Sequence, residues 1–124
     1  MKKLAIGVCL EIVRESVADD YIKVTVALDE LTASRSVYSP SEIGGETLSD
    51  FFARLATNWQ GWPGEERWVS LESDFSLCCS HDGVRCVAVQ AKLSELYRSW
   101  KVEVEFAIEL GALEELSAAA TEFC

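Results

Sequence analysis

The sequence lacks a long apolar run, and it has few basic residues. Among its 124 residues, no window approaches the roughly 18 consecutive apolar residues that a membrane-spanning helix needs. Eleven Lys and Arg side chains stand against 21 Asp and Glu side chains, so the formal net charge is −10. Such a charge repels phosphate backbones and anionic lipid. We therefore expect neither nucleic acid nor a membrane surface as a partner, whereas a basic protein is compatible with this charge.

Motifs of catalysis and cofactor binding are also lacking. The chain has no G-x-S-x-G, P-loop, G-x-G-x-x-G or H-E-x-x-H sequence. Its single histidine, His81, stands beside Asp82 and could form an oriented base, but both residue types are common next to tight turns. Glu65 and Glu66 would point to opposite sides of an extended chain, which prevents joint acid–base work on one bond. We predict no enzyme activity, no catalytic residue and no cofactor.

Cysteine occurs in an odd number and without a metal-binding spacing. The five residues are Cys9, Cys78, Cys79, Cys86 and Cys124. The odd count without a framework spacing favours free thiols in a reducing compartment over a disulfide framework. The absence of a C-x-x-C pair argues against a zinc site. The N-terminus briefly resembles a signal peptide, but Glu11 and Arg14 interrupt its apolar run. We predict a cytoplasmic protein that binds no metal.

The hydrophobic pattern predicts one α+β domain over residues 1–124. With 49% hydrophobic and 26% charged residues, the chain is long enough to bury its own core. Apolar alternation predicts strands at 3–13, 21–28, 31–38, 67–71, 74–80, 84–93 and 99–109. Helical spacing predicts a helix that starts after Thr47 and buries a stripe reaching Trp59, and a second helix at 112–123. The order β-β-β-α-β-β-β-β-α predicts a single antiparallel sheet of six to seven strands with two helices packed on it.

The turn at 81–83 sets the expected register of the strands on either side of it. A three-residue loop with Gly83 in the left-handed conformation pairs Phe75 with Val89 and keeps the apolar residues on one face. We prefer it to a two-residue turn. The same register places Cys78 across from Cys86, where we expect small structural side chains rather than a redox pair.

Three of the four tryptophans, Trp59, Trp62 and Trp68, fall within ten positions. So dense an aromatic cluster typically pins a helix end and a turn onto a sheet, because each ring brings a large apolar area to bury. The alternative is a pocket for a small ligand, lined by the three indole rings. A concave pocket beside them would favour this alternative.

An acidic row runs along the strand predicted at 99–109. Glu103, Glu105 and Glu109 share one side of it, because side chains alternate along a strand. The apolar side, which includes Val104, faces the core. Such a row suits recognition of a basic partner, and it also suits a merely solvated surface. These three carboxylates are our candidate partner-binding residues.

The segment from Trp59 to Glu72 carries the pattern W-x-G-W-x-G-E-x-x-W-x-S-L-E, and an H-D-G turn at 81–83 follows it. Together with a closing strand that begins at Trp100, this pattern resembles a family of short bacterial proteins known as a domain of unknown function. The likeness covers most of the chain and is looser before Gly45. The resemblance implies no activity, since none is established for the family.

We therefore expect a non-enzymatic binding protein. The first hypothesis is docking of a basic partner through the acidic row, for example by an immunity-type protein that neutralises a toxin. The alternative is a small-ligand module with the tryptophan-lined pocket.

Overall fold

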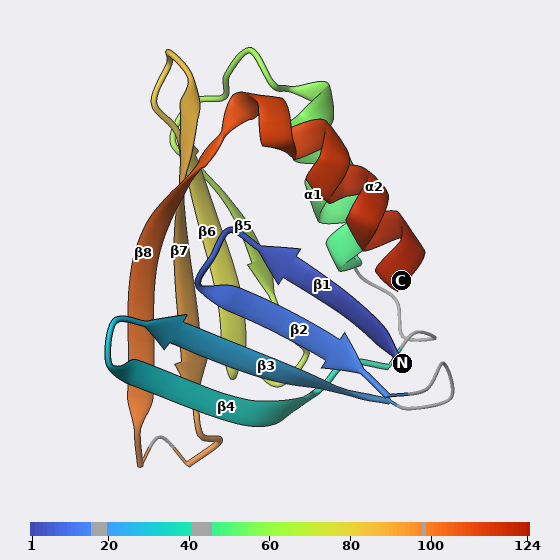
Figure 1. Ribbon diagram of the computed structural model, residues 1–124, viewed down its shortest axis with the longest axis vertical. Helices are drawn as coiled ribbons and strands as arrows, with labels where there is room; N and C mark the ends of the chain where they lie inside the picture. The colour runs from blue at the N-terminus through green and yellow to red at the C-terminus, as the bar shows by residue number, and fades with distance from the viewer. Residues whose placement is uncertain (16–19, 41–45, 98) are drawn as a thin grey trace.

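The chain folds into two antiparallel sheets of four strands and two α-helices (Figure 1). The computed structural model describes residues 1–15, 20–40, 46–97 and 99–124. The first sheet contains β1 (Lys2–Ile6), β2 (Leu10–Arg14), β3 (Tyr21–Leu28) and β4 (Leu31–Tyr38), and α1 (Leu48–Thr57) follows it. The second contains β5 (Glu65–Val69), β6 (Phe75–His81), β7 (Cys86–Ser94) and β8 (Lys101–Glu109), followed by the 3-10 turn η1 (Leu110–Ala112) and α2 (Leu113–Phe123). The α+β class and the antiparallel pairing are confirmed, whereas the expected single sheet of six to seven strands is wrong.

The number of strands differs from the prediction because the segment 3–13 forms two strands, β1 and β2, and not one. Residues 3–13, expected as one strand, form a hairpin in which Ile6 pairs with Leu10. The loop between them has three residues, and Gly7 takes a φ of +62°. With an odd number of loop residues, the residues that pair across the hairpin are both even-numbered or both odd-numbered, and paired residues point to the same face. The alternation of apolar and other residues therefore continues through the turn without a break. Val8, which the alternation placed on the buried face, is 96% exposed at the loop tip.

The hairpin between β6 and β7 has a longer loop than expected. Phe75 pairs with Leu93 and not with Val89, so the predicted register is wrong. The Asp82 carboxylate accounts for the larger loop, because its Oδ1 accepts hydrogen bonds from the three backbone amides of residues 84–86. These amides need no strand partner. The register differs by an even number of residues, so the apolar side chains still share one face, as expected.

Both helices begin near the predicted residues. The Thr47 Oγ1 accepts a hydrogen bond from the Asp50 amide at 3.1 Å, and the Asp50 carboxylate accepts one from the Thr47 amide, which forms a capping box. The helix ends at Thr57, so the helical spacing no longer applies at Trp59. The prediction that Trp59 belongs to the buried stripe is wrong, because the residue is 54% exposed. The predicted buried face of α2 is confirmed at Leu113, Leu116, Ala120 and Phe123.

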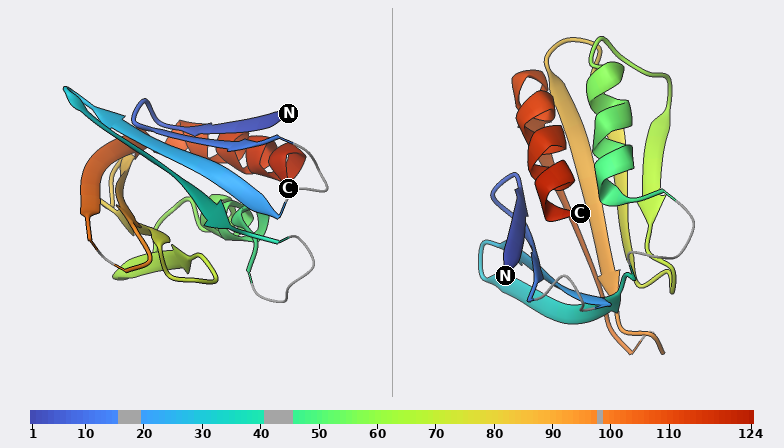
Figure 2. Two further views of the ribbon diagram at one scale, coloured as in Figure 1. Left: turned by 90° about the horizontal axis from the view of Figure 1, so that it is seen from below. Right: turned by 90° about the vertical axis from the view of Figure 1, so that its right-hand side faces the viewer.

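The two helices lie side by side over the inner face of the β5–β8 sheet, and the β1–β4 sheet packs beside them on the same side (Figure 2). One buried cluster joins apolar side chains from both sheets and both helices. The outer face of the β5–β8 sheet is covered by none of the described elements. No helix in the described part of the chain is long and apolar enough to cross a membrane.

Two contacts fix the sheets against each other. Arg35, which alternation places on the inner face of β4, donates from Nε to Asp74 Oδ2 at 3.0 Å. The Asp74 side chain is 1% exposed and also accepts a hydrogen bond from Ser70 Oγ at 2.8 Å. At the β1–β2 turn, a Cβ on Gly7 would lie 2.7 Å from the Phe106 ring, so this turn packs tightly on β8. The buried charge of Asp74 is therefore paired, as burial requires.

Candidate functional site

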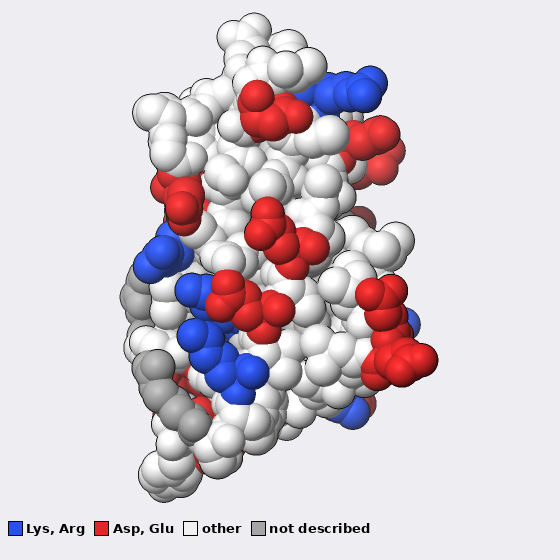
Figure 3. Space-filling model, turned by 90° about the vertical axis from the view of Figure 1, so that its left-hand side faces the viewer, with Lys and Arg blue, Asp and Glu red and all other residues white. Residues whose placement is uncertain are grey.

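β8 presents the acidic row on the open face of the β5–β8 sheet. Glu103, Glu105 and Glu109 are exposed, whereas Val104 and Ile108 on the other side are 4% and 7% exposed. The predicted alternation of this strand is confirmed. Figure 3 views the side of the molecule on which β8 lies, where acidic side chains form separate groups with basic ones between some of them.

The acidic row is not uniformly charged, because β7 lies beside it. Glu103 pairs across the strands with Lys92, and Gln90 Nε2 donates a hydrogen bond to the Glu103 carboxylate. Glu105 and Glu109 are paired with uncharged residues. Cross-strand neighbours of opposite charge offset one another. The uncompensated negative charge is therefore concentrated at Glu105 and Glu109, toward the end of β8 that leads into η1.

Two of the three clustered tryptophans donate hydrogen bonds inward. Trp68 is 6% exposed, and its Nε1 donates to the Glu46 carbonyl at 2.8 Å. Trp62 Nε1 donates to the Cys79 carbonyl at 3.1 Å, and its ring meets that of His81 edge-on. Each indole N–H thus has a backbone acceptor, as buried tryptophans require. The groove between α1 and α2 that the structure describes is lined by Trp59 and by neither Trp62 nor Trp68.

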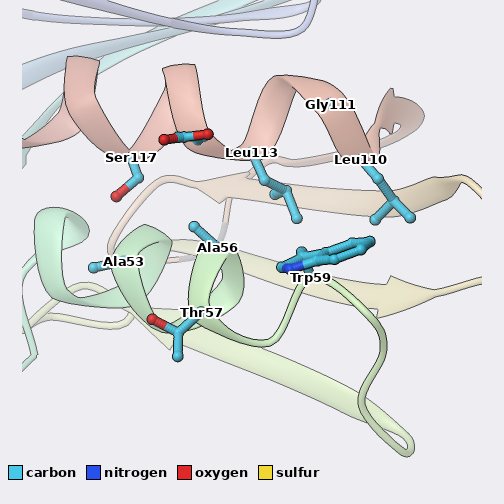
Figure 4. A pocket seen from close by; sticks show the side chains of 9 residues that line it. Ala53, Ala56, Thr57, Trp59, Leu110, Gly111, Leu113 and Ser117 are labelled. Atoms are coloured by element: carbon cyan, nitrogen blue, oxygen red, sulfur yellow. The ribbon is translucent and has the colours of Figure 1, made fainter.

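The third tryptophan, Trp59, lines an open groove of about 570 Å³ between α1 and α2 (Figure 4). In this view the indole ring extends from the end of α1 toward Leu110. Small side chains keep the groove open, since Ala53 and Ala56 border it on α1 and Gly111 borders it at the start of α2. The other lining residues are Thr57, Leu113, Glu114 and Ser117.

The groove combines an apolar lining with one carboxylate, that of Glu114. The start of α2 borders the groove, and Ala112 provides no side-chain cap there. Glu114 and Glu115 lie in the first turn, where carboxylates interact favourably with the positive end of a helix. The Glu114 carboxylate has no hydrogen bond or ion pair with another residue in the part of the chain that the structure describes.

The β6–β7 hairpin holds the backbone of Trp59. The Gly83 amide donates to His81 Nδ1 at 2.8 Å, so the opposite nitrogen, Nε2, carries the proton and donates to the Trp59 carbonyl at 2.8 Å. The loop amides, first that of Cys86, lower the pKa of the Asp82 carboxyl below its ordinary value. The Asp82 carboxylate and His81 Nδ1 are thus bonded within the hairpin loop, and His81 Nε2 links this loop to the Trp59 carbonyl.

All five cysteines are free. Cys78 pairs across the strands with Gln90, so the expected juxtaposition of Cys78 and Cys86 is wrong. Burial raises the pKa of Cys79 to about 12, and burial together with the Glu65 carboxylate raises the pKa of Cys78. Thiols with raised pKa values are weak nucleophiles. Among the described residues, no group of three or more His, Cys, Asp or Glu side chains could hold a metal ion.

The groove itself was missed by the sequence analysis. A weak signal is present, since Ala53 and Ala56 are three residues apart and share a small-residue surface beside the apolar stripe of α1. That surface becomes the wall of a groove only because Gly111 of η1 and Ser117 of α2 line its other side. Which helix packs against which depends on tertiary structure and not on the helical pattern.

The family comparison extends over nearly the whole chain. Residues 6–124 match the model of a family described as a "Family of unknown function (DUF6228)". No curated protein and no solved structure matches the chain. The family description assigns no activity, so the geometry must carry any functional argument.

Proposed function

Because the chain belongs to the family of unknown function DUF6228, we propose its function from its geometry: it is a non-enzymatic binding protein that docks a basic protein partner. The contact residues are Glu103, Glu105 and Glu109 on the open face of the β5–β8 sheet. One concrete form is an immunity-type protein in the cytoplasm that neutralises a basic toxin.

The observation that supports this proposal is the fixed, outward position of the acidic row. The apolar side of β8 is packed into the core at Val104 and Ile108, so the strand cannot rotate its carboxylates inward. Glu103 and Glu105 are held roughly 7 Å apart, the spacing of alternate residues in a strand. Glu105 and Glu109, which have no charged cross-strand partner, would steer a basic partner, and their fixed strand loses little conformational freedom on binding.

The test replaces Glu103, Glu105 and Glu109 together by Gln and compares pull-downs from the lysate of the native host at low and high salt. We expect a basic protein that wild type captures at low salt and loses at high salt, because exposed charges are screened. The triple variant should capture markedly less of it, and its melting temperature should equal or slightly exceed that of wild type.

A charge-matched variant separates docking from the effect of net charge. Replacement of Glu30, Glu72 and Glu122 by Gln removes the same charge from exposed positions outside β8. This control should capture the partner as wild type does. If wild type and both variants capture the same proteins equally at either salt concentration, the acidic row is only a solvated surface.

A small-ligand module is the second candidate function, and the groove beside Trp59 favours it. Its volume, about 570 Å³, lies within the range of small-molecule sites. Trp59 contributes to the groove, whereas Trp62 and Trp68 donate to backbone carbonyls elsewhere. This candidate therefore depends on one tryptophan and the two helices and not on three aromatic walls.

A further inference from the structure

We propose that the groove between α1 and α2 binds a small organic cation with an apolar body, such as a protonated arylalkylamine. The groove is a site separate from the acidic row, so this inference goes beyond the docking function. It rests on the second candidate function and gives the chemical class of its ligand.

Trp59 supplies the aromatic contact. It is 54% exposed although tryptophan carries the largest apolar surface of any side chain, and its carbonyl is held by His81 Nε2 at 2.8 Å. The ring therefore stands on an anchored backbone beside Leu110 and Leu113. An indole face attracts a cation through its quadrupole, and the leucines offer apolar contact to the rest of the ligand.

Glu114 sets the sign of the charge that the groove accepts. The positive end of α2 lies at the same place, and alone it would favour an anion. That end carries the equivalent of roughly half an elementary charge, whereas Glu114 and Glu115 each carry a full negative charge in the first turn. At the start of α2 the charge of the carboxylates therefore outweighs that of the helix end, and the chain's overall charge of −10 adds to it.

None of the described residues that line the groove is Lys or Arg. Their arginine–aromatic contacts place Arg14 over Phe123 and Arg54 over Phe51. Arg54 is further held by ion pairs with Glu46 and Glu66. The ring of Trp59 and the carboxylate of Glu114 thus line one groove without a basic side chain among the lining residues, so a cationic ligand can pair with both.

Three probes with one phenyl ring and different charges test the assignment at pH 7. They are 2-phenylethylammonium, neutral 2-phenylethanol and anionic phenylacetate. Binding is measured by NMR from the shifts of the Ala53 and Ala56 methyl groups and of the Trp59 indole during titration. We expect the ammonium probe to bind about three- to tenfold more tightly than the alcohol, as a cation–aromatic contact and one exposed carboxylate together allow, and phenylacetate to bind more weakly than both.

Matched variants assign the selectivity to the groove. Glu114→Gln should reduce the preference for the ammonium probe over the alcohol to the part that the Trp59 ring supplies, whereas Glu115→Gln, one position away and outside the groove lining, should largely preserve the full preference. Trp59→Ala should weaken all three probes. Since the ring is half exposed, this variant should keep its fold, which a melting curve checks.

Several results would overturn the inference. Equal binding of the ammonium probe and the alcohol, or an equal loss in Glu114→Gln and Glu115→Gln, would remove the role of Glu114. Tighter binding of phenylacetate would assign the groove to anions. If all three probes bind equally, the cation inference is wrong, although the groove would still be a small-ligand site. If none of the probes shifts these signals, both the cation inference and the small-ligand candidate are contradicted.

Discussion

The chain builds the same order of elements twice, and the two units differ in how their helices begin. In each unit four antiparallel strands precede a helix. Thr47 and Asp50 form a capping box before α1, whereas α2 continues from η1 through Ala112, whose backbone is already helical and whose side chain caps nothing. A helix with a local cap is positioned by its own sequence; a helix that continues from a strand is positioned by packing. The uncapped start is also the place where the groove opens.

The contact that joins the two units should give the largest effect when broken. Asp74→Ala would leave Arg35, whose side chain is 17% exposed, without its carboxylate and would remove the acceptor of Ser70 Oγ. We expect a loss of about 3–5 kcal/mol in the free energy of unfolding, as for other broken buried pairs. Denaturant unfolding measures it.

An exposed ion pair within one unit provides the control for this prediction. Lys3 and Glu11 are 54% and 45% exposed, so Glu11→Ala should cost less than about 1 kcal/mol. A similar cost for both variants would mean that Asp74 does not hold the units together.

The second contact between the units is tested by a pair of glycines. Gly7 and Gly83 both have positive φ angles, of 62° and 81°, but only a Cβ on Gly7 meets a neighbour, the Phe106 ring. Gly83→Ala should cost roughly 1–2 kcal/mol from backbone strain, and Gly7→Ala should cost about 1–3 kcal/mol more from overpacking. Melting and denaturant curves compare them. Equal losses would show that the β1–β2 turn shifts freely on β8.

Two substitutions, Thr47→Ala before α1 and Ala112→Thr before α2, test the difference between the starts of the two helices. Thr47→Ala should cost about 1 kcal/mol because it removes the acceptor for the Asp50 amide. Ala112→Thr should give no matching gain, since a capping residue needs extended backbone and Ala112 has a φ of −84° and a ψ of −12°. Stability measurements on both variants decide the question; a clear gain for Ala112→Thr would mean that α2 can begin at a local cap after all.

The smallest effect concerns a loop of the second unit. The loop amides lower the pKa of Asp82 in the folded chain, so its carboxylate stabilises the fold above the ordinary Asp pKa. This contribution disappears as the pH falls through the lowered pKa. The stability of wild type relative to Asp82→Asn should therefore be greatest near neutral pH and shrink on acidification, as melting temperatures at a series of pH values would show. A difference that stays constant with pH would contradict the role of the charge.

The sequence predicted the elements better than it predicted their partners. The faces of β8 and α2 follow from periodicity and were identified, as was the cap at Thr47. The β1–β2 turn could not be seen, because an odd loop preserves the alternation, and the β6–β7 register failed because the Asp82 side chain satisfies amides that a shorter loop would have paired. The packing of the two sheets brings Arg35 onto Asp74 across 39 positions, and no local pattern predicts such a contact.

The candidate site shows the same limit. The exposure of Glu103, Glu105 and Glu109 follows from alternation, whereas the groove requires two helices that are distant in sequence to meet. Trp59 is an instructive case. Two residues beyond the last helical position, it no longer follows the 3.6-residue period that placed it in the core.

The order of the strands has a consequence for the kinetics of folding. In both sheets every strand pairs with the strand that follows or precedes it in sequence, so each pairing closes only a short loop. Short loops cost little entropy to close, and topologies rich in local contacts fold fast for their size. We therefore expect the hairpins of each unit to form early, while the Arg35–Asp74 contact forms in the later step that docks the first sheet onto the second. Substitutions at this contact should then accelerate unfolding more than they slow folding.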